Sequence, residues 1–399
     1  MSKFKMGGPG IIIAAAFIGP GTVTICTLAG ANHGLQLLWA VLLSIGLTIF
    51  LQEMSIRLSI VSRLDLVDLI KQEIQLPIIK SIVLFIILSA VVIGNGAYEA
   101  GNISGGALGI NSFIDLSIGS INLTPILIGL IAFTILWYGT QKVLATSLTF
   151  LVILLSVGFI ASAIMVQPNL GLLLSNIFVP HIPKDGFLLV LGVFGTTVVP
   201  YNLFLHASLA KQKWANETSL FEARRDTIIA ISIGGIISMA IVISASTLEG
   251  QSINNAMDMA KGLEPIFGSF AKYLISLGLF SAGITSAITA PLAAAYVLTT
   301  GLGWNTSLKS WPFRLTWISV LFSGVLFSSI GYKPISIIHF AQITNGLILP
   351  IVAILLVWLC TKKSILKNHL NNRFTTLAGI FMVTLLLVLG FKSIWMVFR

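Results

Sequence analysis

Two short motifs place proline beside hydroxyl and amide side chains within apolar sequence, one near position 20 and the other near position 200. A proline inside a helix removes a backbone hydrogen bond, and neighbouring glycines let the chain unwind. In a lipid bilayer the freed carbonyl and amide groups need partners, which a bound ion or small polar molecule can supply. The motifs therefore predict a substrate site at two broken helices. Its candidate residues are Gly19, Pro20, Gly21, Thr22 and Thr24 in the first motif, Thr196, Thr197, Val199, Pro200, Tyr201 and Asn202 in the second, and Gln342 on a distant segment.

One carboxylate and one imidazole could carry a proton through the apolar sequence. Of the 13 acidic residues, only Glu99 lies well inside an apolar segment. An intramembrane carboxylate is costly and is a functional candidate by default. We therefore predict a proton pathway through Glu99 and His206, which lies about a turn and a half beyond the second motif. The alternative is a structural role, in which Glu99 joins helices through Asn95, Asn102 or His206.

Hydroxyl groups recur along one side of the segment 268–298, at Ser281, Thr285 and Ser286. Residues three or four positions apart lie on the same face of a helix. With unwound carbonyl groups near Gly19, these hydroxyls would form a site for a coupling sodium ion. Close helix packing through small residues explains the same pattern equally well.

The composition excludes a water-soluble protein. The chain of 399 residues is 56% hydrophobic and 9% charged, whereas soluble domains carry about 25% charged residues. The net charge of +10 does not require a nucleic-acid partner, because basic residues collect in the cytoplasmic loops of membrane proteins. Cys26 and Cys360 are far apart, so we expect no disulfide framework and no metal cluster. No nucleophile and base stand at an enzyme-like spacing, so we expect neither catalysis nor a cofactor.

The apolar sequence divides into about eleven segments, and most are long enough to cross a hydrocarbon core of roughly 30 Å as a helix. We therefore predict an all-α integral membrane protein, with residues 1–399 forming a single transmembrane domain. The breaks fall in the first and sixth segments. These positions are equivalent if residues 9–166 and 187–360 form two inverted repeats of five helices each. The segment 374–397 would then be an extra helix. The segments are 9–31, 35–60, 78–108, 124–140, 143–166, 187–210, 226–248, 268–298, 312–331, 334–360 and 374–397.

The basic residues predict an orientation in the cell membrane. If the N-terminus is cytoplasmic and every segment crosses once, most of the 23 basic residues fall on the cytoplasmic side. Two connectors, Ser62–Gln75 and Trp214–Arg225, carry helical patterns that predict amphipathic helices at the cytoplasmic interface. The basic residues left outside are Lys184, Lys261, Lys272, Lys333, Lys392 and Arg399.

The chain resembles the Nramp (natural resistance-associated macrophage protein-like) family of divalent metal transporters. The stretch Gly8–Gly34 is similar to the family's first helix, and Val199–His206 is similar to its Met-Pro-His-Asn-Leu-Tyr-Leu-His motif. Gln342 with Leu349-Pro350 resembles the family's tenth helix, where Gln342 would line the pathway or join helices. The resemblance covers nearly the whole chain and implies a leucine-transporter-like fold of five plus five inverted helices.

The chain departs from this family at its metal ligands. The family's Asp-Pro-Gly-Asn motif reads Gly19–Thr22 here, so its Asp and Asn are absent. Val199 replaces the family's sulfur ligand, and Tyr201 replaces its motif histidine. In the Asp-x-x-Glu proton pair, Gly96 stands in the first place and only Glu99 is kept.

These departures leave two candidate substrates for a transporter that works by alternating access. Second half-helices begin at about Thr22 and Tyr201, and helix N-termini attract anions. The missing carboxylates therefore slightly favour a small anion such as bicarbonate, coupled to sodium or protons. The alternative is a divalent cation (manganese, iron or magnesium) coupled to protons. Beyond this ion and the lipid bilayer, we expect no obligate protein partner.

Overall fold

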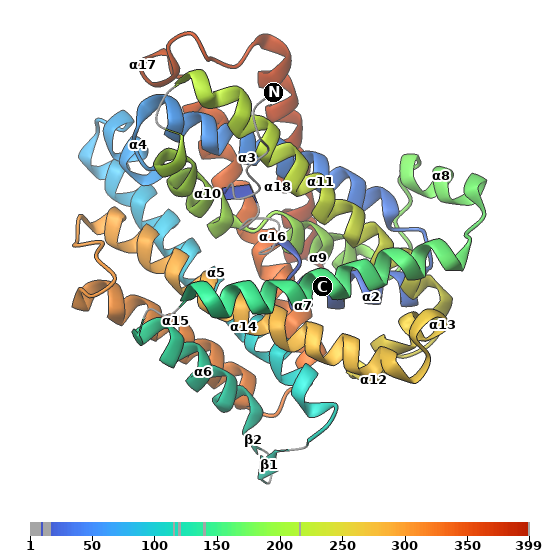
Figure 1. Ribbon diagram of the computed structural model, residues 1–399. Coiled ribbons are helices and arrows are strands. Elements are labelled where there is room, and N and C mark those ends of the chain that lie inside the picture. Colours follow the sequence, from blue (N-terminus) through green and yellow to red (C-terminus); the bar gives the residue numbers. More distant parts are fainter. Residues whose placement is uncertain are drawn as a thin grey trace.

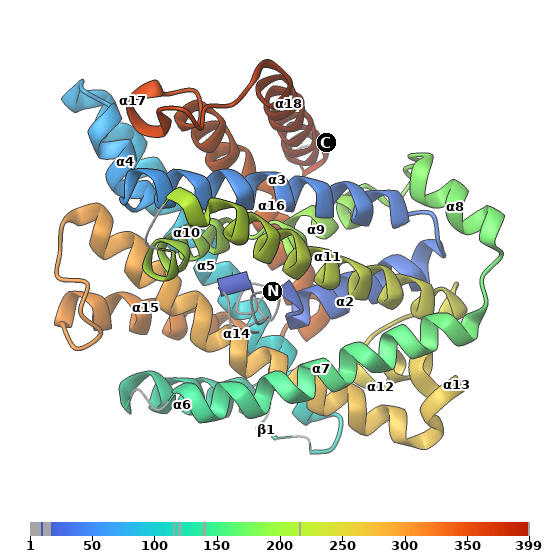
Figure 2. The same ribbon diagram turned by 45° about the horizontal axis from the view of Figure 1, so that its top comes forward.

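The computed structural model describes residues 9–10, 17–114, 116–118, 121–138, 141–214 and 217–397. This part of the chain is helical except for its loops and one short hairpin (Figures 1 and 2). The hairpin pairs β1 (Ser117–Ile118) with β2 (Ile121–Asn122) in antiparallel register, with Ser117 opposite Asn122. The prediction of an all-α membrane protein is confirmed.

Each predicted apolar segment contains a long helix, and the segment 187–210 contains two. Eight helical stretches within the described ranges are long and apolar enough to cross a membrane. The helices α2, α6 and α15 lie outside that set but occupy the remaining predicted segments. The long helices are α2 (Pro20–His33), α3 (Leu38–Ser62), α5 (Pro77–Asn111), α6 (Thr124–Tyr138), α7 (Gln141–Val166), α9 (Phe187–Thr197), α10 (Pro200–Lys213), α11 (Leu220–Ala245), α14 (Ala271–Leu302), α15 (Trp311–Ser329), α16 (Pro334–Leu359) and α18 (Arg373–Val397).

Most of these helices pack into two groups. The first helix group consists of α2, α3, α9, α10 and α11, and the second consists of α5, α6, α14 and α15. In the second group, a Cβ atom on Gly283 of α14 would lie 2.6 Å from the Cα atom of Gly106 on α5, so these two backbones touch. The helix α16 packs against both α5 and α9, and α7 packs against both α11 and α14. At the edge of the molecule, α18 packs on α16 (Figure 2).

Short helices connect the long ones. The apolar residues Leu66, Val67, Leu69 and Ile70 of α4 are buried, so the apolar face of this amphipathic helix is docked on the bundle. The connector Trp214–Arg225 is largely the start of α11, apart from residues 215–216, which lie outside the described ranges. The short helices are α4 (Leu66–Glu73), α8 (Leu170–Phe178), η1 (Glu217–Ser219), η2 (Ser246–Leu248), α12 (Ala256–Ala260), η3 (Lys261–Leu263), α13 (Glu264–Phe267), η4 (Gly268–Phe270) and α17 (Lys363–Leu366).

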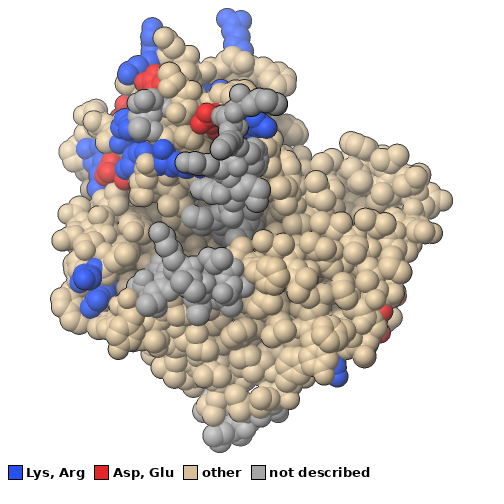
Figure 3. Space-filling model, viewed as in Figure 1, with Lys and Arg blue, Asp and Glu red and all other residues tan. Residues whose placement is uncertain are grey.

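The helix ends that were assigned to the cytoplasm lie together. Arg63, after α3, donates to the backbone carbonyl of Trp214 at 2.8 Å. Glu53 of α3 accepts a hydrogen bond from Arg224 of α11 at 2.8 Å. Figure 3 shows most of the visible Lys and Arg side chains gathered at the top of the molecule, near α4, α10 and α17 in Figure 1. The charged ends thus share one face, as the count of basic residues requires.

Candidate functional site

Both predicted helix breaks are present. Phe17 is helical, the next two residues form a bend, and α2 then begins at Pro20 after an extended Gly19. In the second motif α9 ends at Thr197, and α10 begins at Pro200. Proline fits the first turn of a helix because its missing N–H group would have no partner there. Among the described residues, no side-chain cap is present at the N-terminus of α2 or of α10.

The two breaks touch each other through a pair of threonines. The hydroxyl of Thr22 donates to the carbonyl of Phe17 at 2.5 Å. The hydroxyl of Thr196 lies 2.9 Å from that of Thr22. Because Thr22 gives its only proton to Phe17, Thr196 is the donor in the second bond. These bonds join the end of α9 to the start of α2.

Gln342 of α16 lies between the two breaks. A Cβ atom on Gly21 would lie 2.3 Å from the side-chain nitrogen of Gln342, and one on Gly195 would lie 1.8 Å from its backbone oxygen. On the other side, a Cβ atom on Gly105 of α5 would lie 2.2 Å from the Cβ atom of Pro20. At Gly195 the contact is with a backbone atom, so glycine is required there. At the other two positions an added carbon would meet the side chain of Gln342 or of Pro20.

Several buried polar atoms around the breaks have no hydrogen-bond partner within the described part of the chain. A buried polar atom normally has one, and leaving it unpaired costs about 1–3 kcal/mol. Unpaired atoms at helix breaks are therefore candidates to contact a transported ion. Among the predicted substrate residues they are Thr24 Oγ1, Tyr201 OH, Asn202 Oδ1 and Gln342 Oε1.

Thr197 and Val199 make contacts of a different kind. The Thr197 hydroxyl donates to the carbonyl of Val193 at 2.6 Å and accepts from Ser44 of α3 at 3.2 Å. Val199 packs in an apolar cluster that includes Tyr98 of α5 and Tyr201. The rings of Tyr98 and Tyr201 meet edge to face, with centroids 5.5 Å apart. Sequence reasoning missed Tyr98, although an aromatic residue directly before the one intramembrane acid was a usable signal.

Glu99 is completely buried on the face of α5 that packs against α15. A Cβ atom on Gly324 of α15 would lie 2.5 Å from the Cγ atom of Glu99. Its Oε2 atom accepts a hydrogen bond from Asn102 at 3.2 Å, whereas Oε1 has no partner among the described residues. The hydrogen bond to Asn102 is one of those expected if Glu99 has a structural role. The unpaired Oε1 atom remains available to bind a proton.

His206 has a defined tautomer. Its Nδ1 atom lies 2.7 Å from the side-chain oxygen of Gln52 on α3. Because that oxygen can only accept, Nδ1 carries the proton, and Nε2 is a lone-pair acceptor. Nε2 is buried and has no partner in the described ranges. Gln52 was not foreseen from the sequence. No hydrogen bond joins Glu99 to His206 in the part of the chain that the structure describes.

The predicted coupling-ion hydroxyls on α14 differ in their hydrogen bonding. Thr285 donates to the carbonyl of Ser281 at 2.7 Å, which satisfies it within its own helix. Ser281 is completely buried, and its hydroxyl oxygen has no partner among the described residues. Ser286 is also buried. The predicted coupling site thus offers the Ser281 hydroxyl as its unpaired group.

The described residues include no group of three or more His, Cys, Asp or Glu side chains that could hold a metal ion. The breaks themselves carry hydroxyl and amide groups and no carboxylate or sulfur. A cation at this site would therefore meet neutral oxygen atoms, and an anion would meet the uncapped N-termini of α2 and α10.

Comparisons with known proteins extend over almost the whole chain. A divalent metal cation transporter MntH of Caldanaerobacter subterraneus is 23% identical, with 98% of this chain and 93% of that protein covered. One from Staphylococcus aureus is 26% identical, with 98% and 90% covered. A manganese transporter of Eremococcus coleocola has a similar structure, with a TM-score of 0.77 at 19% identity over 97% of this chain and 85% of that one. MhsT in complex with L-phenylalanine shares the fold, with a TM-score of 0.63 at 16% identity over 97% and 98% of the two chains.

The family assignment rests on a match along the chain. Residues 10–396 match the model of the family described as Nramp: Natural resistance-associated macrophage protein-like. This match includes both broken helices and α16, which together form the site. The chain therefore belongs to the Nramp family of membrane transporters.

Proposed function

We propose that this transporter carries a hard divalent metal cation, such as manganese or magnesium, by alternating access. The Caldanaerobacter and Staphylococcus relatives are named divalent metal cation transporters. The missing carboxylates in the sequence slightly favoured an anion, and the comparisons do not support that preference. They favour the cation that the sequence left as the alternative.

The observation that carries this proposal is a pair of unpaired amide oxygens. Asn202 Oδ1 and Gln342 Oε1 are buried and have no hydrogen-bond partner among the described residues. Amide and hydroxyl oxygens suit hard cations such as Mg²⁺ and Mn²⁺. Val199 stands where the family has a sulfur ligand, so softer transition metals have no thioether to bind. The site should therefore prefer hard cations.

The cation should keep part of its hydration shell. Mg²⁺ gives up water reluctantly and usually retains several water molecules when it binds to a protein. Neither break has a carboxylate, so the cation would bind neutral oxygens alone. These oxygens offset little of the free energy needed to remove all of its water. A partly hydrated ion fits a site of neutral oxygens better than a bare one.

A small anion is the second candidate, and one observation favours it. Both α2 and α10 begin at a break, and neither N-terminus has a side-chain cap. Unpaired N–H groups and the helix dipole make such termini attractive to negative charge. Bicarbonate would then take the place of the cation.

The coupling ion stays a prediction for either substrate. Glu99 and His206 offer unpaired buried atoms to a proton. Ser281 offers an unpaired hydroxyl to sodium, whereas the hydroxyl of Thr285 is bonded within its own helix.

Uptake into proteoliposomes of the purified protein separates the two substrates. We expect saturable uptake of labelled manganese that magnesium inhibits and an external chelator abolishes. We expect no uptake of labelled bicarbonate above that of empty liposomes. Chelator-resistant bicarbonate uptake without manganese uptake would reject the cation and establish the anion.

A further inference from the structure

A cavity of about 150 Å³ lies between α10, α14 and α4. Leu205 and Ser208 of α10 line it, together with Ala293 and Tyr296 of α14. Asp65, directly before α4, also contributes. The cavity thus separates a helix of the first group from a helix of the second, and it combines charged, polar and apolar side chains.

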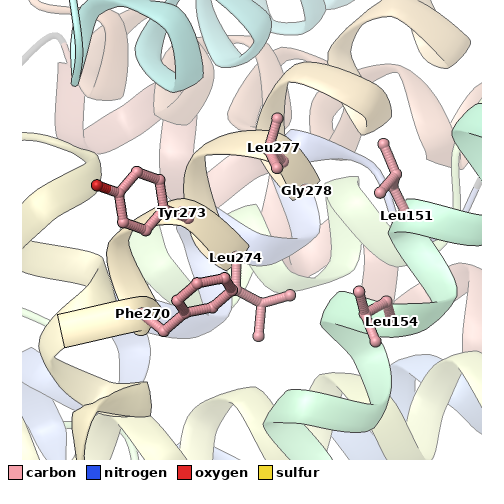
Figure 4. Close-up of a pocket in the computed structure, with 7 residues that line it drawn as sticks. All are labelled: Leu151, Leu154, Phe270, Tyr273, Leu274, Leu277 and Gly278. Carbon is pink, nitrogen blue, oxygen red and sulfur yellow. The ribbon is translucent and has the colours of Figure 1, made fainter. Parts of the chain in front are cut away.

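A larger cavity of about 350 Å³ between α7 and α14 is of another kind (Figure 4). It is lined by leucines, a glycine, Phe270 and Tyr273. Phe270 is 67% exposed on the outer surface of the helices. This apolar cavity has no charged group for an ion, and none of its lining residues belongs to either break.

The inner end of the 150 Å³ cavity is one layer of side chains away from the second break. Ala293 lines the cavity and also packs in the cluster with Tyr98, Val199 and Tyr201, and Leu205 packs against that cluster. We call this cluster the tyrosine layer. Val199 and Tyr201 flank Pro200 in the break, so the tyrosine layer closes the way from the break to the cavity.

The other end of the cavity is bordered by α4 and by two polar contacts. Asp65 pairs with Lys211 of α10 at 2.5 Å. Lys71 of α4 donates to the backbone carbonyl of Thr300 of α14 at 2.5 Å. The second oxygen of Asp65, Oδ1, is buried and has no partner within the described ranges. These contacts join α4 to both helix groups on the face that carries the basic residues.

We propose that this cavity is the cytoplasmic branch of the substrate pathway and that the Asp65–Lys211 ion pair is its outer gate. The tyrosine layer is the inner gate. Alternating access requires a route from the central site that opens as one helix group moves against the other. The cavity lies along that boundary.

The proposal rests on the chain being a transporter, but it does not depend on which ion is transported. Its test is therefore the accessibility of an introduced cysteine in inside-out vesicles. The native cysteines should add little to the labelling, because Cys26 and Cys360 are both buried. Ser208→Cys reports on the cavity, and Lys363→Cys on the exposed α17 is the control that reacts in every variant.

We expect a charged, membrane-impermeant thiol reagent to modify Ser208→Cys from the cytoplasmic side and to block uptake. Asp65→Asn or Lys211→Gln should raise the modification rate about threefold to fivefold, because a partly exposed ion pair contributes modestly to the closed state. Exchanging the charges in the Asp65→Lys, Lys211→Asp double variant should return the rate toward the native value. The Lys363→Cys rate should stay constant throughout.

Modification of Ser208→Cys from the outer side alone would overturn the proposal. So would a modification rate that neither single variant changes. Recovery in the charge-exchanged variant shows that the single variants fold and act through the pair. If the labelling results hold but no manganese uptake is found, the proposed substrate is wrong and the pathway stands.

Discussion

At the scale of single residues, the site replaces charged ligands with neutral ones. Thr24, Asn202 and Gln342 present oxygen atoms that nothing in the described chain satisfies. Keeping such atoms buried and unpaired costs stability, which a substrate ion would restore on binding. The selectivity of the transporter should therefore depend on these amides and hydroxyls.

Removing either amide should weaken substrate binding. Asn202→Ala and Gln342→Ala each delete one oxygen ligand, and we expect the dissociation constant for manganese to rise about tenfold, since a bond to a charged group contributes about 1.5–3 kcal/mol. Calorimetric titration of the purified protein measures this change. Thr344→Ala, on the same helix as Gln342 and bonded to its own backbone, is the control and should bind normally. Equal affinities in all the variants would place the ion elsewhere.

Neutralising the intramembrane acid should separate transport from proton coupling. Glu99→Gln keeps an oxygen that can accept from Asn102 but cannot exchange a proton. We expect manganese affinity within about twofold of the native value, because Glu99 lies on α5, packs against Gly324 of α15 and is on neither broken helix. We also expect uptake that no longer increases with an inward proton gradient. Uptake measured at matched and unmatched pH on the two sides checks this.

Ser323→Ala is the control for the Glu99 variant. Ser323 lies on α15 against Gly96 of α5, in the same helix interface, but it carries no titratable group. Its gradient response should be native. A gradient response that persists in Glu99→Gln would exclude Glu99 from the proton pathway.

At the scale of elements, glycine lets three helices meet at the site. The end of α9 and the start of α2 both press against α16 at Gln342, and α5 presses against Pro20 from the other side. These approaches leave no room for a side chain. The broken helices are thus held in place by these close contacts as well as by the Thr22–Thr196 hydrogen bond.

Adding one methyl group at the tightest of these contacts should unfold the site. In Gly195→Ala the new carbon would lie 1.8 Å from the Gln342 carbonyl oxygen, a backbone atom that cannot rotate away. Overpacking typically costs about 1–3 kcal/mol, and we expect this variant at or above that upper limit. Thermal unfolding in detergent measures the loss.

Gly46→Ala is the matched control for this contact. Gly46 lies inside α3, with no atom within 4 Å of the added carbon. Alanine is favoured over glycine in a helix by up to about 1 kcal/mol, so this variant should be as stable as the native protein or more stable. Equal unfolding temperatures for the two alanine variants would contradict the packing account.

At the scale of the whole molecule, the chain consists of two helix groups with the site at their boundary. The helices α2, α9 and α10 of the first group carry the breaks, whereas α5 of the second carries Glu99. The helix α16 contacts both groups and places Gln342 between the breaks. Movement of one group against the other would expose the same site to either side of the membrane in turn.

The orientation of the molecule can be measured directly. We predict that the face with Lys363 is cytoplasmic and that the face with Lys184 is external, because basic residues are retained on the cytoplasmic side. Lys184→Cys should react with an impermeant maleimide in intact cells, and Lys363→Cys should react only after the membrane is opened. The native chain, whose two cysteines are buried, is the unlabelled control. The reverse pattern would invert the proposed pathway.

The sequence by itself determined the helices and their breaks. Long apolar segments favour helices in a bilayer, and proline with nearby glycine favours a break, so both features follow from local chemistry. A proline alone does not end a helix, since α14 and α16 continue through Pro291 and Pro350. The segment 187–210 accordingly holds α9 and α10 with Pro200 at the start of the second. Glu99 was identified in the same way, because a carboxylate in apolar sequence stands out without any knowledge of its neighbours.

Only the tertiary structure decided which groups meet. Thr22 and Thr196 are 174 positions apart, His206 and Gln52 are 154 apart, and Lys211 and Asp65 are 146 apart. No local pattern encodes such pairs, because they arise when separate helices pack. Packing also decided what the apolar face of α4 contacts, because that face is buried against the rest of the protein. The sequence likewise did not show that the side-chain oxygens of Asn202 and Gln342 are left buried and unpaired among the described residues, because that depends on how the helices pack.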